Sequence, residues 1–105
     1  MQPENIDELK KEGFTLCKSG KYKEAISCYD KILSMQPKNV GELIKSGNIS
    51  FALGEYKEAV SNYDKILTEK PEDVDALLNK GFALYELGRY EEAIDCYDKP
   101  DKEPI

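Results

Sequence analysis

Apolar residues recur in this chain at intervals of three and four positions, the spacing that lines one face of an α-helix. One such stripe runs over residues 22–33 and a second over 56–67, with polar residues on the opposite face. Pro37 and Pro71 follow the two stripes and end the helices, because proline cannot continue the helical hydrogen-bond pattern. The pattern therefore predicts an all-α protein.

The same pattern returns at an offset of 34 residues, so that the chain contains three copies of one unit. A fixed period of this size is typical of stacked helical repeats. Nine positions hold the same residue in all three copies: Leu9/Leu43/Leu77, Gly13/Gly47/Gly81, Gly20/Gly54/Gly88, Tyr22/Tyr56/Tyr90, Glu24/Glu58/Glu92, Ala25/Ala59/Ala93, Tyr29/Tyr63/Tyr97, Asp30/Asp64/Asp98 and Lys31/Lys65/Lys99.

Each copy is predicted to form two helices joined by a glycine turn. A short polar residue that can cap free amides precedes the first helix, and in two copies a Glu three residues later completes a capping-box pattern. The first helix ends at a Gly that can adopt the left-handed conformation. The caps are Asn5, Asn39 and Asp73, the capping-box acids are Glu8 and Glu42, and the turn glycines are Gly20, Gly54 and Gly88.

Two further positions carry small residues in every copy. We expect Gly13 on the first helix to face Ala25 on the second, and likewise in the other copies, so that the two backbones approach closely. A larger side chain at either position is predicted to force the pair of helices apart. The other two pairs are Gly47 with Ala59 and Gly81 with Ala93.

Together these features resemble the tetratricopeptide repeat, with its mid-helix Gly, Gly turn followed by an aromatic residue, Ala, second aromatic residue and closing Pro. The resemblance covers residues 3 to about 99. It implies a right-handed α-solenoid of three helix-turn-helix repeats, forming one domain over 1–105. The repeats are expected at about 6–39, 40–73 and 74–99, followed by an irregular tail over 100–105. Pro100 stands where the other copies have Ile, so we expect the last helix to stop short.

The charge of the chain argues against nucleic acid as a partner. The net charge is −6 and the sequence pI is about 4.7, so the chain lacks the basic surface that phosphate binding requires. The charge is also uneven, running from +1 over residues 1–39 through −3 over 40–73 to −4 over 74–105.

Catalysis and metal binding are also unexpected. The chain has no His, which is the commonest acid–base group and metal ligand. Its carboxylates lie on polar helix faces, where charged groups are usually solvated. Cys17, Cys28 and Cys96 show no C-x-x-C spacing and are interpreted as small packing residues. We therefore expect no enzyme, no cofactor and no metal site.

Cellular location follows from the same residues. The odd number of Cys and the polar first residues favour a cytoplasmic protein without a signal segment. No apolar run approaches the roughly 18 residues that cross a bilayer, so we expect no membrane contact.

The resemblance also implies a binding surface, because in this family the first helices line a concave groove. That groove would be suited to an extended or helical peptide with apolar anchors and negative charge. Its aromatic residues could instead pack on neighbouring repeats, and any single lysine could simply be solvated. The expected groove residues are Lys10, Lys11, Phe14, Cys17 and Lys18 from the first copy, Ile44, Lys45, Asn48 and Phe51 from the second, and Leu78, Asn79, Phe82 and Tyr85 from the third.

One subset of the family grips the acidic tail of cytosolic chaperones with a clamp of Lys, Asn and Arg side chains. Of the clamp positions, only Lys10 carries the expected residue here; the others hold Phe14, Lys45, Asp75 and Asn79. An acid at Asp75 would repel a carboxylate, so chaperone-tail binding is not favoured.

Two functions remain open at this stage. The first is a protein–protein interaction module that binds a peptide or protein segment in its groove. The alternative is an assembly element that self-associates or belongs to a longer repeat array, with no groove ligand. The alternative rests on the uncapped end of the third repeat, around Ile94 and Tyr97, which could form a homo-oligomer.

Overall fold

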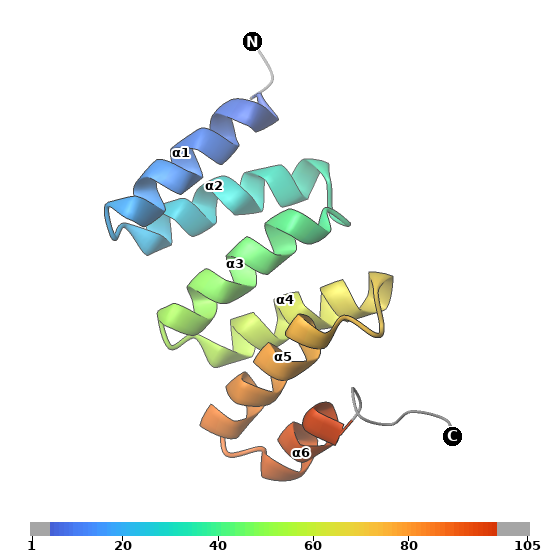
Figure 1. Cartoon of the computed structure of the whole chain (residues 1–105). Coiled ribbons are helices and arrows are strands. Elements are labelled where there is room, and N and C mark those ends of the chain that lie inside the picture. The colour runs from blue at the N-terminus through green and yellow to red at the C-terminus, as the bar shows by residue number, and fades with distance from the viewer. Residues whose placement is uncertain (1–4, 99–105) are drawn as a thin grey trace.

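The computed structural model describes residues 5–98, and within that range it consists of six α-helices joined by short turns. Successive helices zigzag along one axis, as Figure 1 shows, so that each packs on the helix before it and the helix after it. The helices are α1 (Ile6–Lys18), α2 (Tyr22–Met35), α3 (Val40–Ala52), α4 (Tyr56–Glu69), α5 (Val74–Glu86) and α6 (Tyr90–Asp98). The predicted helical solenoid is confirmed.

The predicted caps and turns lie at the ends of these helices. Asn39 Oδ1 accepts a hydrogen bond from the backbone N–H of Glu42 at 3.2 Å, and Asp73 Oδ1 accepts one from Ala76 at 2.9 Å. These bonds satisfy amides that the first turn of a helix leaves without an internal partner. The three turn glycines have φ between 77° and 80°, which only glycine adopts without strain.

The predicted capping box of the second repeat forms only in part. A full box would turn the Glu42 carboxylate back to the Asn39 amide. The Asn39 N–H instead donates to the Gln36 carbonyl at 3.1 Å, and the Glu42 carboxylate lies between Lys10 and Lys45. The prediction was wrong on this point because the preceding turn already occupies the capping amide.

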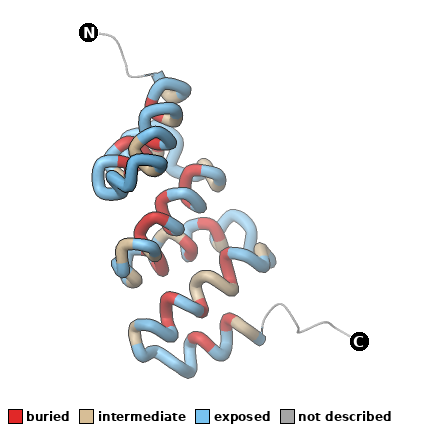
Figure 2. The backbone as a smooth tube through the Cα atoms, turned by 60° about the vertical axis from the view of Figure 1, so that its left-hand side comes forward, coloured by how far each residue is buried: buried red, intermediate tan, exposed pale blue. Residues whose placement is uncertain are grey.

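The core lies along the inner faces of the stacked helices, where Figure 2 shows the buried residues, while the outer faces are exposed. One cluster of buried residues is centred on Tyr29 and Ile32 and the other on Tyr63 and Ile66. Each cluster contains residues from more than one repeat, so the repeats stabilise one another by burying apolar surface between them.

The atoms nearest to the mid-helix glycines belong to a tyrosine ring of the second helix, a contact that the sequence analysis did not predict. A methyl group added at Gly13 would lie 2.8 Å from Cε1 of Tyr29, and one at Gly47 would lie 2.9 Å from Cε1 of Tyr63. Gly81 repeats the arrangement with Tyr97. The glycines therefore make room for a tyrosine ring of the second helix. On the second helix the repeated alanine and the repeated tyrosine, such as Ala25 and Tyr29, lie four residues apart, which is one helical turn. Spacing in the sequence therefore does not distinguish which of them lies nearer the glycine.

The predicted Pro100 stop and the tail over 100–105 lie outside the described residues. The boundaries of the three repeats stay as predictions.

Two glycines of α3 offer a matched test of the ring contact. We expect Gly47→Ala to destabilise the protein by about 1–3 kcal/mol, because the added methyl group overpacks against Tyr63. Gly41→Ala should raise stability by up to about 1 kcal/mol, because Ala favours the helix and the new methyl group comes no nearer than 3.5 Å to Asn39 Oδ1. Urea unfolding of both variants measures the difference; equal stabilities would contradict the ring contact.

Candidate functional site

The residues predicted to line the groove all lie on first helices, at positions that the repeat makes equivalent. We call this surface the first-helix face. Its members in the prediction are Lys10, Lys11, Phe14, Cys17 and Lys18 on α1, Ile44, Lys45, Asn48 and Phe51 on α3, and Leu78, Asn79, Phe82 and Tyr85 on α5. Each is at least partly exposed, so each can reach a ligand.

Three aromatic side chains of this face are largely exposed. Phe14 is 60% exposed, Tyr85 56% and Phe82 47%. Phe14 lies beside the ammonium group of Lys18, whose Nζ is 5.4 Å from the ring centroid, a cation–π contact. Exposed aromatic rings of this size are common anchors of protein interfaces.

Phe51 differs from the other two phenylalanines. It is partly buried against the core and packs edge-to-face on Tyr56, with ring centroids 5.3 Å apart. Tyr56 begins the second helix of the same repeat, so this ring contact lies within one repeat, and it leaves Phe51 less accessible to a ligand than Phe14.

The half of the face formed by α1 and α3 contains a charged cluster. The Glu42 side chain is almost fully buried, and its Oε1 lies 3.8 Å from Lys10 Nζ and 3.6 Å from Lys45 Nζ. Lys45 Nζ also lies 5.9 Å from the ring centroid of Tyr29. Two partly exposed lysines share one carboxylate, so the cluster keeps an excess positive charge that can attract an anionic group.

Glu42 is the member of this cluster that sequence analysis did not assign to the site. Its Oε2 has no hydrogen-bond partner among the described residues. A signal was present in the sequence, since the equivalent residue of the third repeat is Ala76, which is buried in the core. An acid at a position that faces the preceding repeat must find a basic partner there.

Asn48 is held by the second helix of its own repeat. The hydroxyl of Tyr63 donates to Asn48 Oδ1 at 2.7 Å. The carbonyl oxygen of Asn48 is thereby engaged, and its NH₂ group is left as the donor that can face a ligand.

Burial changes the acidity of the two tyrosines beneath the face. Burial raises the pKa of Tyr63 to about 12. For Tyr29, burial together with the neighbouring Cys17 and Glu42 raises the pKa to about 12. The side chains of Tyr29 and Tyr63 are therefore both uncharged near neutral pH, where peptide binding would be measured.

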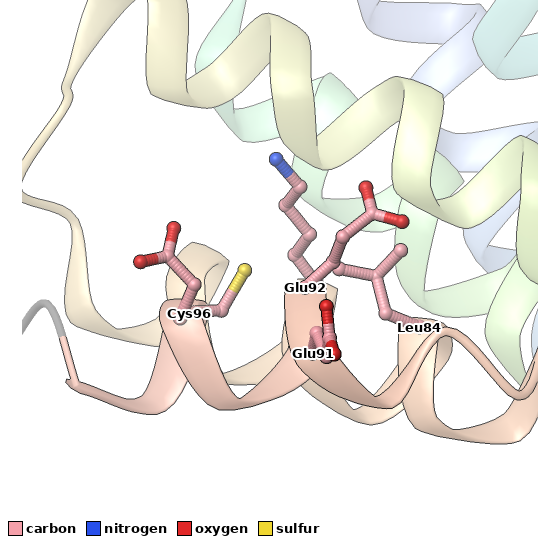
Figure 3. Close-up of a pocket in the computed structure, with 6 residues that line it drawn as sticks. Leu84, Glu91, Glu92 and Cys96 are labelled. Atoms are coloured by element: carbon pink, nitrogen blue, oxygen red, sulfur yellow. The ribbon is translucent and has the colours of Figure 1, made fainter.

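Cavities of measurable volume lie elsewhere on the molecule. One of about 370 Å³ lies between α2, α3 and α4 and includes Ser46, Ser50 and Asn62 in its lining. A second, of about 300 Å³, lies between α5 and α6, where Figure 3 shows Glu91, Glu92 and Cys96 around it. Neither is lined by a residue predicted for the groove.

Within residues 5–98 no cluster of side chains could hold a metal ion, and no helix there is long and apolar enough to span a membrane. Cys17, Cys28 and Cys96 are not joined in disulfides.

Comparison with known proteins gives one family match. The model of a family described as "Anaphase-promoting complex, cyclosome, subunit 3" matches residues 18–100. No curated protein matches the chain.

Several solved structures share the fold. A MamA mutant superposes with a TM-score of 0.85 at 24% identity, over 95% of this chain and 73% of that one. MamA from Desulfovibrio magneticus RS-1 gives 0.83 at 23% identity over 91% of this chain, which spans 54% of the MamA chain. The first TPR of Spaghetti (RPAP3), bound to the HSP90 peptide SRMEEVD, gives 0.80 at 28% identity, over 90% of this chain and 75% of that one.

The raised tyrosine pKa values predict an alkaline transition. A folded-state pKa above the ordinary value of 10.0 means that these tyrosines contribute stability below pH 10 that is lost as the pH rises toward 12. We expect the free energy of unfolding to fall over this window, and to fall less steeply in Tyr63→Phe. Urea unfolding at several pH values, with tyrosinate absorbance as a second readout, measures both. An unchanged slope in the variant would contradict the assignment.

Proposed function

Because the chain belongs to the tetratricopeptide repeat family, as the match over residues 18–100 and the shared fold establish, we propose that it is a scaffold that holds a polypeptide segment on its first-helix face. Proteins of this kind act by positioning other proteins, and the proposal includes no catalytic step. The observation that carries it is the set of exposed aromatic side chains on the first helices of the first and third repeats.

The aromatic side chains supply the affinity in this proposal. Phe14, Phe82 and Tyr85 each expose about half or more of their surface on equivalent sides of α1 and α5. Covering an exposed aromatic ring removes apolar area from water at roughly 25 cal/mol per Å². A polypeptide that spans the first-helix face with an apolar residue at each end would gain from both groups of rings.

In this proposal the charged residues of the protein set the orientation of the bound segment along the first-helix face. Lys10, Lys18 and Lys45 lie at the N-terminal half of the first-helix face, and Lys10 and Lys45 share the single buried carboxylate of Glu42. The third repeat, in contrast, is acidic. We propose that the acidic residues of the ligand lie over α1 and α3 and its apolar residues over α5.

The binding mode differs from a two-carboxylate clamp. The RPAP3 domain, which is similar over 90% of this chain, was solved with the acidic peptide SRMEEVD. Of the clamp residues only Lys10 is in place here, and Asp75 puts an acid where a base would be needed. The proposed ligand is therefore held by aromatic contacts first and by charge second.

The proposal predicts which side chains the affinity depends on. Peptides selected from a random display library on the wild-type protein should bind Phe14→Ser and Tyr85→Ser at least about tenfold more weakly, because each change removes an apolar anchor. Fluorescence anisotropy of a labelled selected peptide gives the Kd. The matched control is Met35→Ser, which also removes an exposed apolar side chain, here from the second helix α2.

A loss of affinity in Met35→Ser equal to that in the two aromatic variants would contradict the proposal. So would full affinity in both aromatic variants. Thermal unfolding of each variant separates a lost contact from a lost fold, and the exposure of all three positions predicts that the fold survives.

The lysine pair has its own prediction. Lys10→Gln combined with Lys45→Gln and Glu42→Gln, which leaves no buried carboxylate without a partner, should weaken a selected peptide that carries acidic residues and should reduce the salt dependence of its binding, because the excess positive charge near the ligand is removed. Titrations at low and high salt measure both quantities. Unchanged salt dependence would place the acidic residues of the ligand away from this cluster.

A further inference from the structure

The last helix exposes an apolar position that the other two repeats cover. Ile94 on α6 is 56% exposed, whereas its equivalent on α4, Val60, is 7% exposed and belongs to the core. The equivalent on α2, Ile26, is partly buried against the core. Tyr97 follows the same trend, since it is less buried than Tyr29 and Tyr63. We call Ile94, Tyr97 and Asp98 the α6 end face.

The structure itself shows what covers the two equivalent faces. On α4 the cover is α5, which buries Ala76, Ala83 and Leu84 in the same cluster as Val60. A charge completes the contact, because Lys80 Nζ of α5 lies 2.6 Å from a carboxylate oxygen of Asp64 on α4. A helix with small apolar residues and one base therefore fits this face.

The α6 end face presents the same elements. Ile94 stands in the register of Val60, and Asp98 stands in the register of Asp64. Asp98 is exposed, as Asp64 is. A basic residue in the covering helix would pair with Asp98 as Lys80 of α5 pairs with Asp64, whereas at the α2–α3 contact, where the acid is Asp30, α3 carries Ser46 in the register of Lys80.

A second copy of this chain does not supply such a helix. In head-to-tail stacking α1 would have to take the place that α5 takes on α4. The α1 residues in the register of Lys80 and Ala83 are Glu12 and Thr15, both exposed and polar. Glu12 would then face the acid Asp98 of the neighbouring copy, which is repulsive. Pairing two α6 end faces would likewise bring acid to acid.

We propose that the α6 end face is a second docking surface, and that its occupant is an amphipathic helix of another sequence. That helix presents Ala- and Leu-sized residues at the positions of Ala76, Ala83 and Leu84, with a Lys or Arg at the position of Lys80. This surface is distinct from the first-helix face, so that the scaffold holds two partner segments at once. The proposal does not depend on the groove ligand.

Helix α5 covers α4 in the way proposed for the occupant of the α6 end face, so a peptide with the sequence of α5 serves as the probe. A synthetic peptide of residues 73–89 contains α5 with its Asp73 cap and presents the face that α5 turns to α4. Added to isotopically labelled full-length protein at up to millimolar concentration, it should shift the amide signals of Ile94, Tyr97 and Asp98 in a saturable way. A short free helix is marginally stable, so weak affinity is expected.

Three matched changes test the specificity of that binding. Ile94→Asp in the protein should abolish the shifts, while Met35→Asp, at another exposed apolar position, should leave them intact. A probe with Lys80→Glu should bind at least about fivefold more weakly, because it places acid against acid. A peptide of residues 5–21, which contains α1, should not bind. The peptide selected for the first-helix face should bind Ile94→Asp normally.

Two results would overturn the proposal. The first is the absence of shifts at the α6 end face, or their persistence in Ile94→Asp. The second is a concentration-dependent dimer in sedimentation that Ile94→Asp abolishes, which would assign the face to a second copy.

Discussion

The contact between a glycine of the first helix and a tyrosine ring of the second sets the geometry of every repeat. At Gly13, Gly47 and Gly81 a side chain would occupy space that the ring of the paired tyrosine fills. The ring can then lie close to the backbone of the first helix, and the Tyr63 hydroxyl reaches across to Asn48. The angle between the two helices, and hence the surface each first helix presents, depends on this fit.

Each repeat has two kinds of surface, one covered by the neighbouring repeat and one left exposed. Residues that face the neighbouring repeat are buried and mostly apolar, as Val60 and Ala83 are. Residues on the first-helix face are left uncovered in all three copies, and at the third repeat the α6 end face is uncovered as well. The proposed functions follow from these two kinds of uncovered surface.

Much of the fold could be predicted from the sequence, since period, caps, turn glycines and apolar spacing all depend on local rules. Partners across helices were harder to predict. The atom nearest to a methyl group added at Gly47 belongs to the ring of Tyr63, a contact that depends on the rotation of the second helix as well as on spacing. The contact of Glu42 with Lys45 is an i,i+3 pair on α3, but its contact with Lys10 depends on packing between repeats, which no spacing within one repeat encodes.

For the candidate site, the positions that share the first-helix face could be predicted from the sequence, but the exposure of each side chain on that face could not. Equivalent residues of the repeat had to share a face, but Tyr85 is exposed while Phe51, at the equivalent position of α3, is partly buried, although each packs on the equivalent tyrosine of the following helix. The repeated tyrosine contact therefore does not by itself determine how exposed the first-helix residue is.

Binding of a polypeptide on the first-helix face can be tested by mapping a selected peptide onto the protein by NMR. We expect intermolecular contacts from the peptide to the side chains of Phe14, Phe82 and Tyr85, with its acidic residues near Lys10 and Lys45. Contacts confined to α2 and α4, with none to the three aromatic rings, would contradict this expectation.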